Sequence, residues 1–190
     1  NKVDKDLELY SSLIGIDRYS TKIFEYHKAH LVPFGEYIPF KNILPLKKIT
    51  PGLMDYTQGR RKSVIIKKFD LAIWPLICYE AIFPQEVRVS NRLVDLLINV
   101  TNDTWYGNSS GPYQHLEISR MRAIENGLPM LRLANNGISA FIDPVGRILS
   151  KTELNQVTVL DNYVPKKLSE ETFFSKYNPS ILVLQMLGVL

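Results

Sequence analysis

The sequence has a single cysteine, Cys78, and three histidines among its 190 residues. One cysteine excludes an internal disulfide framework, so cysteine usage does not indicate the redox compartment. No Cys/His cluster has the spacing of a zinc site. The chain also lacks an arginine-rich strip interleaved with aromatic residues, which argues against a protein that binds nucleic acid.

Charge and hydropathy are not extreme. Apolar residues make up 45% of the chain and charged residues 22%, an ordinary balance for one globular domain with a sizeable core. The formal net charge is +4. This mild excess suits an anionic surface such as lipid headgroups, but it is too diffuse to indicate a nucleic-acid partner.

The two ends differ in character. The first eight residues, NKVDKDLE, are polar and do not begin with Met, so there is no signal-peptide pattern and we expect a fragment. The last ten, Ile181 to Leu190, are almost wholly apolar. A bilayer needs about 20 residues, so this stretch predicts either a buried terminal helix or the first half of a membrane helix.

Strand patterns alternate with one good helical pattern along the chain. The helix is predicted over 112–126, with Pro112 in its first turn and a stop signal at Gly127. Strands are predicted at 11–15, 21–26, 63–66, 71–77, 93–100, 130–134, 138–142 and 147–149. The central strands are too apolar to face water, which predicts an α/β fold with covered sheets.

Between Lys41 and Lys62 the sequence has no clean period, and basic residues are interleaved with apolar ones. A loop longer than about 12–15 residues is usually functional or disordered. Two interpretations stay open for it, a loop that contacts lipid and an ordinary solvated surface loop.

Cys78 follows the buried strand 71–77 directly and precedes a predicted helix over Glu80 to Val89, with Pro84 in or near its first turn. A sharp strand-to-helix turn is one way to hold a nucleophile at a fixed point. Free cysteines are also among the most buried residues. From the residues alone, both a nucleophile and an inert buried thiol remain open.

Lys28 and Glu36 form a second candidate pair. Lys28 ends a predicted strand, and Pro33 and Gly35 let the chain fold back before Glu36. A lysine near a thiolate would favour the ionised sulfur and stabilise an oxyanion, and a carboxylate would hold that lysine. The alternatives are two ordinary surface residues here, or a Cys–His pair that uses His27 or His30.

The polar loop Thr101 to Gly111 follows a buried strand, where α/β proteins place their ligands. It carries Asn102, Asp103, Trp105 and Tyr106. A substrate-binding loop and a well-capped turn are both consistent with this pattern.

Four stretches together resemble a known family: YHKAHLVPFGEYIPF, ICYE, LLINVTNDTWYGNSSGPYQH and SRMRAIENGLPMLRLANNGISAFIDPVGRI. They resemble the nitrilase (carbon–nitrogen hydrolase) superfamily and, within it, the bacterial apolipoprotein N-acyltransferases. The resemblance runs from about Tyr10 to Leu149. It implies a nitrilase-type αββα sandwich, incomplete on its N-terminal side, over residues 1–176, with 177–190 as the start of a C-terminal membrane helix.

The superfamily uses a Glu–Lys–Cys triad. The resemblance implies that Cys78 is the nucleophile, Lys28 the triad lysine and Glu36 a further glutamate that supports the lysine and the base. Tyr79 and Glu80 are implied to bind substrate, with the Tyr79 N–H in the oxyanion hole. Trp105 is expected near the acyl or lipoprotein substrate, and the triad glutamate is missing from this chain.

The implied reaction moves a fatty acyl group from a phospholipid to Cys78 as a thioester, and then to the N-terminal amine of an apolipoprotein. It needs no metal and no cofactor. We expect a monomer at the bacterial inner membrane, with its catalytic domain in the periplasm, and no turnover by these residues alone. Two alternatives are a soluble nitrilase-type amidase and a non-catalytic binding protein.

Overall fold

The computed structural model describes residues 8–40 and 54–177. The chain divides into two compact units, Asn1–Arg61 and Lys62–Leu190. The predictions for most of the 41–62 loop and for 181–190 lie outside the described residues. Within the described ranges, no helix has the length and apolar character needed to cross a membrane.

The first unit is built on the hairpin β1 (Ser12–Ile16) and β2 (Lys22–His27), which pair antiparallel as the sequence predicts. The Asp17 carboxylate closes the turn by accepting the backbone N–H groups of Tyr19 and Thr21 at 2.8 and 2.9 Å. Tyr26 near the end of β2 is 1% exposed, so the hairpin already leads into buried structure at its C-terminal end.

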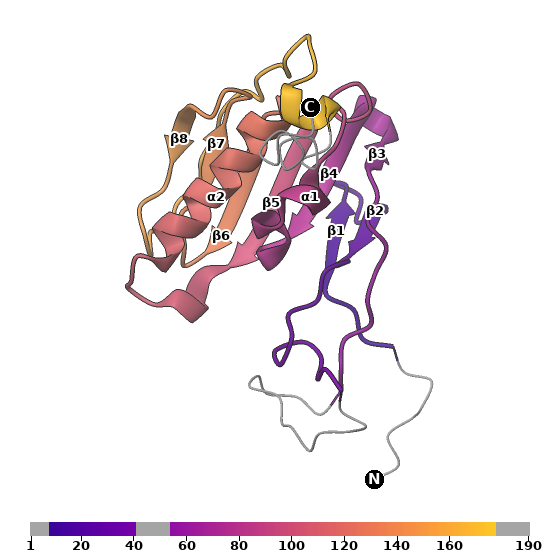
Figure 1. The fold of residues 1–190 in the computed structure, drawn as a ribbon, viewed down its shortest axis with the longest axis vertical. Helices are drawn as coiled ribbons and strands as arrows, with labels where there is room; N and C mark the ends of the chain where they lie inside the picture. The colour runs from indigo at the N-terminus through magenta and orange to yellow at the C-terminus, as the bar shows by residue number, and fades with distance from the viewer. Residues whose placement is uncertain (1–7, 41–53, 178–190) are drawn as a thin grey trace, which may run out of the picture. The chain divides into compact units, whose positions relative to one another are not determined.

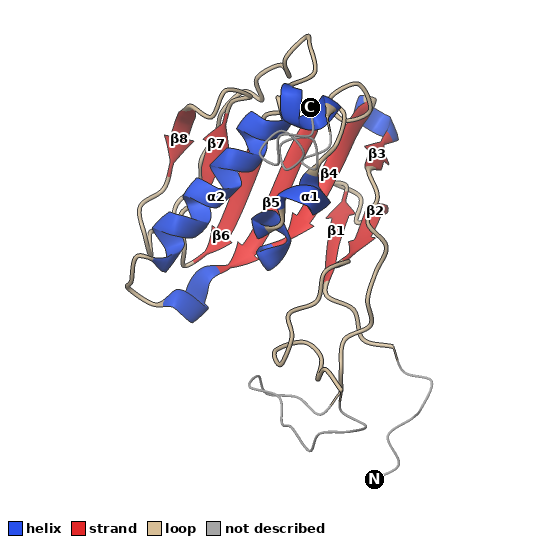
Figure 2. Ribbon diagram, in the orientation of Figure 1, coloured by secondary structure: helices blue, strands red, loops and turns tan. Residues whose placement is uncertain are grey.

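The second unit is a six-stranded sheet in the order β3-β4-β5-β6-β7-β8 (Figures 1 and 2). Strands β4 (Leu71–Ile77), β5 (Leu96–Asn102) and β6 (Met130–Asn135) are parallel to one another. The flanking strands β3 (Val64–Ile66), β7 (Ala140–Ile142) and β8 (Ile148–Lys151) are antiparallel to their neighbours. The predicted α/β class is confirmed.

Helix α2 (Gly111–Asn126) lies along one face of this sheet, with the short helix α1 (Pro84–Val87) on the same side (Figure 2). It buries Leu116 and Ala123 in the main core cluster with Leu97 of β5 and Met130 of β6. Gly127 ends α2 in the left-handed conformation (φ 62°), as the stop signal predicts. A third short helix, α3 (Phe173–Lys176), follows later in the chain.

Two predicted elements differ most from the structure. The strand placed at 93–100 begins at Leu96, and Leu93 is 71% exposed. Asp95 explains the late start, because its carboxylate accepts the Ala72 N–H at 2.9 Å and the Lys167 ammonium at 2.6 Å.

The helix predicted over Glu80 to Val89 is instead a 3₁₀ turn over Cys78–Ile82 followed by the single-turn α1. Pro84 accounts for the break, because the residue before a proline is driven into the extended conformation. Phe83 is extended (φ −99°, ψ 95°), and Pro84 then starts α1.

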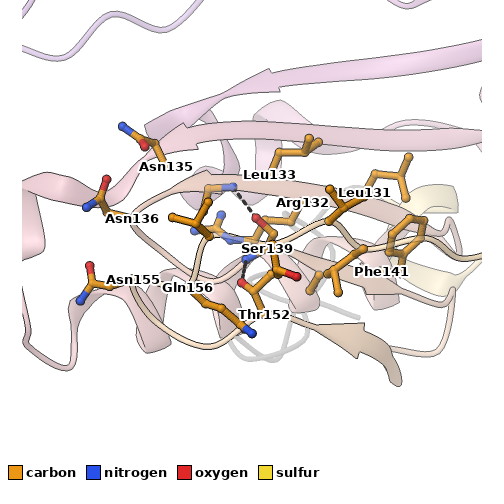
Figure 3. Close-up of a pocket in the computed structure, with 16 residues that line it drawn as sticks. Leu131, Arg132, Leu133, Asn135, Asn136, Ser139, Phe141, Thr152, Asn155 and Gln156 are labelled. Atoms are coloured by element: carbon orange, nitrogen blue, oxygen red, sulfur yellow. Dashed lines mark hydrogen bonds between the residues drawn. The ribbon is translucent and has the colours of Figure 1, made fainter.

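The sheet face opposite α2 carries a pocket of about 510 Å³, shown in Figure 3. Leu131 and Leu133 of β6, Phe141 of β7 and the segment 155–160 line it. None of the predicted site residues lines this pocket. Leu133 is 52% exposed and Val159 89% exposed, so this face presents apolar side chains to the outside.

Candidate active site

Cys78 sits where strand β4 ends and the 3₁₀ turn begins, half-buried and with a free thiol. Its backbone has φ 54°, in the left-handed region that residues other than glycine seldom adopt. Such a conformation costs about 1–3 kcal/mol and persists only where the surroundings impose it. The sharp strand-to-turn geometry expected for a nucleophile is therefore present at this position.

The Leu76–Ile77 peptide, one unit before the peptide that joins Cys78 to the strand, is held on both sides. The Ile77 N–H donates to the Glu80 carboxylate at 2.7 Å, and the Asn99 side-chain amide donates to the Leu76 carbonyl at 3.2 Å. Glu80 is only 2% exposed. Glu80 thus lies beneath the turn rather than on its surface, which is the position of a residue that orients the Cys78 backbone.

The strain at Cys78 is open to a direct test. We expect Cys78→Gly to be more stable than Cys78→Ala by about 1 kcal/mol, because only glycine adopts φ 54° without steric cost. Both variants lack the thiol. The difference between their free energies of unfolding in the full-length protein therefore measures the cost of the left-handed backbone at position 78. Equal stability of the two variants would show that this turn is unstrained.

The loop after β5 forms a second turn in the same unit. Residues Asp103–Tyr106 make a 3₁₀ turn whose first residue is 1% exposed, while Trp105 is 68% exposed. The Asn102 side chain caps the turn by accepting the Thr104 N–H at 3.2 Å. The loop is therefore a capped turn, and it also projects a large aromatic side chain outward.

A buried polar network lies behind this turn. Arg132 of β6 donates from Nη2 to Asp103 Oδ2 at 2.7 Å, and both side chains are 0% exposed. His115 of α2 lies with Nδ1 2.9 Å from Asp103 Oδ1, and Thr101 donates to the same oxygen at 3.0 Å. Because an ionised carboxylate only accepts, His115 Nδ1 carries the proton in this contact.

Charge sets the protonation of this network. Burial alone would raise the pKa of Asp103, but the hydrogen bond from His115 and the charge of Arg132 outweigh it, so the pKa lies below its usual value. Burial lowers the pKa of Arg132, while Asp103, Cys78 and Tyr106 act in the opposite direction. Burial, followed by the charge of Cys78, raises the pKa of Tyr106. Cys78 therefore lies within electrostatic range of both Tyr106 and Arg132.

Sequence reasoning named Asp103 but missed Arg132, His115 and Asn99. The signal that could have found two of them is a polar residue inside an otherwise apolar strand. Asn99 and Arg132 interrupt apolar strands, and buried polar side chains in such strands almost always have partners.

Lys28 and Glu36 form an ion pair within the first unit, although their spacing alone favours two ordinary surface residues. The Lys28 ammonium donates to both carboxylate oxygens of Glu36 at 2.8 Å, and Lys28 is 2% exposed. Glu36 also accepts the Val32 N–H at 2.8 Å, across a turn in which Phe34 has φ 61°. Lys28 and Glu36 are therefore not two independent surface residues, which was one of the alternatives.

Gly59 packs against the chain next to Lys28. Its N–H donates to the Lys28 carbonyl at 2.8 Å, and a Cβ there would lie 2.2 Å from the His27 carbonyl oxygen. His27 has contacts of its own, a hydrogen bond with Ser12 at 2.7 Å and a stacked Tyr10 ring at 4.2 Å. Lys28 and Cys78 belong to different units, so their meeting, and any Cys–His pair, stays a prediction.

Comparison with known proteins agrees with these features. The model of the carbon–nitrogen hydrolase family matches residues 2–172. The chain belongs to the carbon–nitrogen hydrolase family. Among solved structures, a carbon–nitrogen hydrolase from Helicobacter pylori is similar over 78% of this chain and 54% of its own, with a TM-score of 0.57 and 16% identity. This likeness confirms the nitrilase-type fold.

Relatives with higher identity are named apolipoprotein N-acyltransferase. The Rickettsia prowazekii protein is 56% identical over 183 residues, and the Rhodopseudomonas palustris protein is 46% identical over 161. These alignments cover 96% and 82% of the chain, but only 37% and 30% of the relatives. An amidase from Nesterenkonia (TM-score 0.52, 20% identity, 76% of this chain and 51% of its own) bears an acetamide moiety on its active-site cysteine.

Proposed function

We propose that this chain is the catalytic part of an apolipoprotein N-acyltransferase that carries the acyl group on Cys78. The observation that carries the proposal is the Cys78 turn, a thiol in left-handed backbone at the end of β4, in a chain 56% identical to a protein of that name. Because the chain spans only 37% of that relative, the activity is proposed for the whole protein.

In the first half-reaction the Cys78 thiolate attacks the ester carbonyl of a phospholipid. The carbon–sulfur bond forms, the carbon–oxygen bond breaks, and lysophospholipid leaves with a proton. The Tyr79 backbone N–H and the Lys28 ammonium donate to the oxyanion, and each such donor is typically worth roughly 10²–10³ in rate. Glu36 holds Lys28 through both carboxylate oxygens.

In the second half-reaction the N-terminal amine of the diacylglyceryl-cysteine attacks the thioester carbonyl. The amide forms, the thiolate leaves, and a base removes one proton from the amine. The resemblance assigns that base to a glutamate upstream of residue 1, so we propose that turnover needs the longer protein. Trp105, exposed on its turn, is the residue proposed to contact the acyl chain or the lipoprotein.

Both substrates are lipids, so we propose that the site opens to the bacterial inner membrane from the periplasmic side. Two segments are assigned to this task. One is the basic and apolar loop 41–62, most of which lies outside the described residues, and the other is the apolar end 181–190, as the start of a membrane helix. Lysine and arginine near an anionic surface are worth about 1 kcal/mol each. The proposed protein is a monomer.

Intact-mass spectrometry of the full-length protein with phospholipid tests the proposal. We expect the mass to rise by one fatty acyl group on Cys78, and the Cys78→Ser variant to show no thioester. Adding a diacylglyceryl-cysteine peptide should discharge the thioester into an N-acyl peptide. Discharge to free fatty acid alone would favour the amidase alternative, and no adduct at all would favour a binding protein.

A further inference from the structure

Two turns of the second unit are joined by one buried chain of hydrogen bonds. At its centre is Arg132, which is 0% exposed on its side chain and reaches in two directions. Nη2 donates to Asp103, the first residue of the turn that carries Trp105. Nη1 donates to Asn99 Oδ1, and the amide of Asn99 donates to the Leu76 carbonyl, two residues before Cys78.

Strand register explains why Arg132 can make this connection. Leu76, Asn99 and Arg132 lie side by side across β4, β5 and β6. Neighbouring strands are about 4.8 Å apart, so an extended arginine on β6 spans the β5 side chain between them. Ser119 of α2 accepts a further hydrogen bond from Arg132 at 2.9 Å and closes the network from the helix side.

The network is poorly suited to a purely stabilising role. Arg132 Nε is buried without a hydrogen-bond partner in the part of the chain that the structure describes. An unsatisfied buried donor costs about 1–3 kcal/mol, and buried ion pairs are often replaceable by apolar side chains without loss of stability. A fold that only needed stability would fill this site with apolar residues, as it does with Leu97 and Met130 beside it.

We propose that Arg132 is a positioning residue that fixes the spacing between the Cys78 turn and the Asp103–Tyr106 turn. Through Asn99 it holds the Leu76–Ile77 peptide at the end of β4, one unit before Cys78, and through Asp103 it holds the turn proposed to contact substrate. Nucleophilic attack needs reacting atoms about 3–3.5 Å apart, and a displacement of 1 Å costs about 10²-fold in rate. The inference rests on the proposed role of Cys78, but not on acyl transfer itself.

A substitution at Gly137 can perturb this network without removing any of its polar groups. A Cβ on Gly137 would clash with Asp103 Oδ2 and lie 2.9 Å from the Ala134 Cβ. Gly137→Ala therefore displaces the Asp103 carboxylate at one end of the network. The reactivity of Cys78 at the other end then shows whether the displacement is transmitted. Arg132→Lys removes the central hydrogen bonds of the network, because one ammonium cannot donate to Asp103 and Asn99 in the geometry of a guanidinium.

The test uses the full-length protein and iodoacetamide, with alkylation of Cys78 followed by peptide mass spectrometry. We expect Arg132→Lys and Gly137→Ala each to change the Cys78 alkylation rate constant and to lower the acylation rate at saturating phospholipid, each by about tenfold or more. The matched control is Arg122→Lys on α2, where a buried arginine bonds Glu125 at 2.7 Å and its side chain donates a hydrogen bond to neither turn. It should leave both rates within about twofold of the wild type, whatever its effect on stability.

Folded Arg132→Lys and Gly137→Ala proteins with wild-type alkylation rates would overturn the inference and leave the network a structural feature. If Arg132→Lys fails to fold, Gly137→Ala decides alone. If alkylation changes as expected but no acyl adduct forms on the wild type, the positioning role stands and the proposed function fails.

Discussion

Lys28→Met in the full-length protein is expected to slow formation of the Cys78 thioester by about 10²–10³-fold. Methionine keeps most of the stem of Lys28 but removes the ammonium that donates to both oxygens of Glu36. In the proposed mechanism, losing that charge removes one donor to the oxyanion and one favourable charge near the thiolate. The measurement is the single-turnover rate of acyl-enzyme formation, followed by intact mass.

Lys22 offers a matched control at the start of β2, the strand that leads directly to Lys28. Its ammonium also bonds a glutamate, Glu25, at 2.6 Å, but its side chain is 58% exposed. Lys22→Met should therefore leave the thioester rate within about twofold of the wild type, because exposed ion pairs contribute little. A Lys28→Met rate within tenfold of the wild type would remove Lys28 from the catalytic group.

Arg132→Met is expected to lower the free energy of unfolding by about 3–5 kcal/mol, because it leaves the buried Asp103 carboxylate without its cation. The double variant Asp103→Leu/Arg132→Met should recover most of this loss, since no unpaired charge remains buried. Arg147→Met is the control: Arg147 bonds Asp143 at 2.6 Å but is 78% exposed, so a loss of at most about 1 kcal/mol is expected.

The same loss should depend on pH with a definite sign. The folded-state pKa of Asp103 is lowered, so its contribution to stability is present above the unfolded-state pKa of about 3.9. That contribution disappears as the pH falls through the folded-state pKa. The stability gap between wild type and Arg132→Met should therefore be constant near neutral pH and shrink in acid. A gap independent of pH would show that lost packing, and not charge, causes the effect.

The sequence predicted the strands well where periodicity and burial agree. Leu71–Ile77 is confirmed to the residue, and the α2 helix differs by one residue at its start. Errors arose where a single side chain overrides the pattern. Asp95 delays β5 with its hydrogen bond to the Ala72 N–H, and Pro84 divides a helical pattern into two short turns.

The sequence predicted individual residues of the candidate site but not the hydrogen bonds that join its strands. The Lys28–Glu36 ion pair was expected from the family resemblance, because the spacing of the two residues alone also suits two surface side chains. The Arg132 network could not be derived the same way, because it depends on the order of β4, β5 and β6 in the sheet. Strand order is a tertiary property, and local pattern does not encode which buried arginine faces which carboxylate.

The exposed apolar face beside the pocket has a practical consequence for handling this domain. Val157 and Val159 are 102% and 89% exposed, and they line the same pocket as the half-exposed Leu133. Exposed apolar patches on a soluble domain mark an interaction surface or lead to aggregation. When these 190 residues are expressed alone, we therefore expect them to self-associate through this apolar surface, and this self-association would limit the yield of soluble protein.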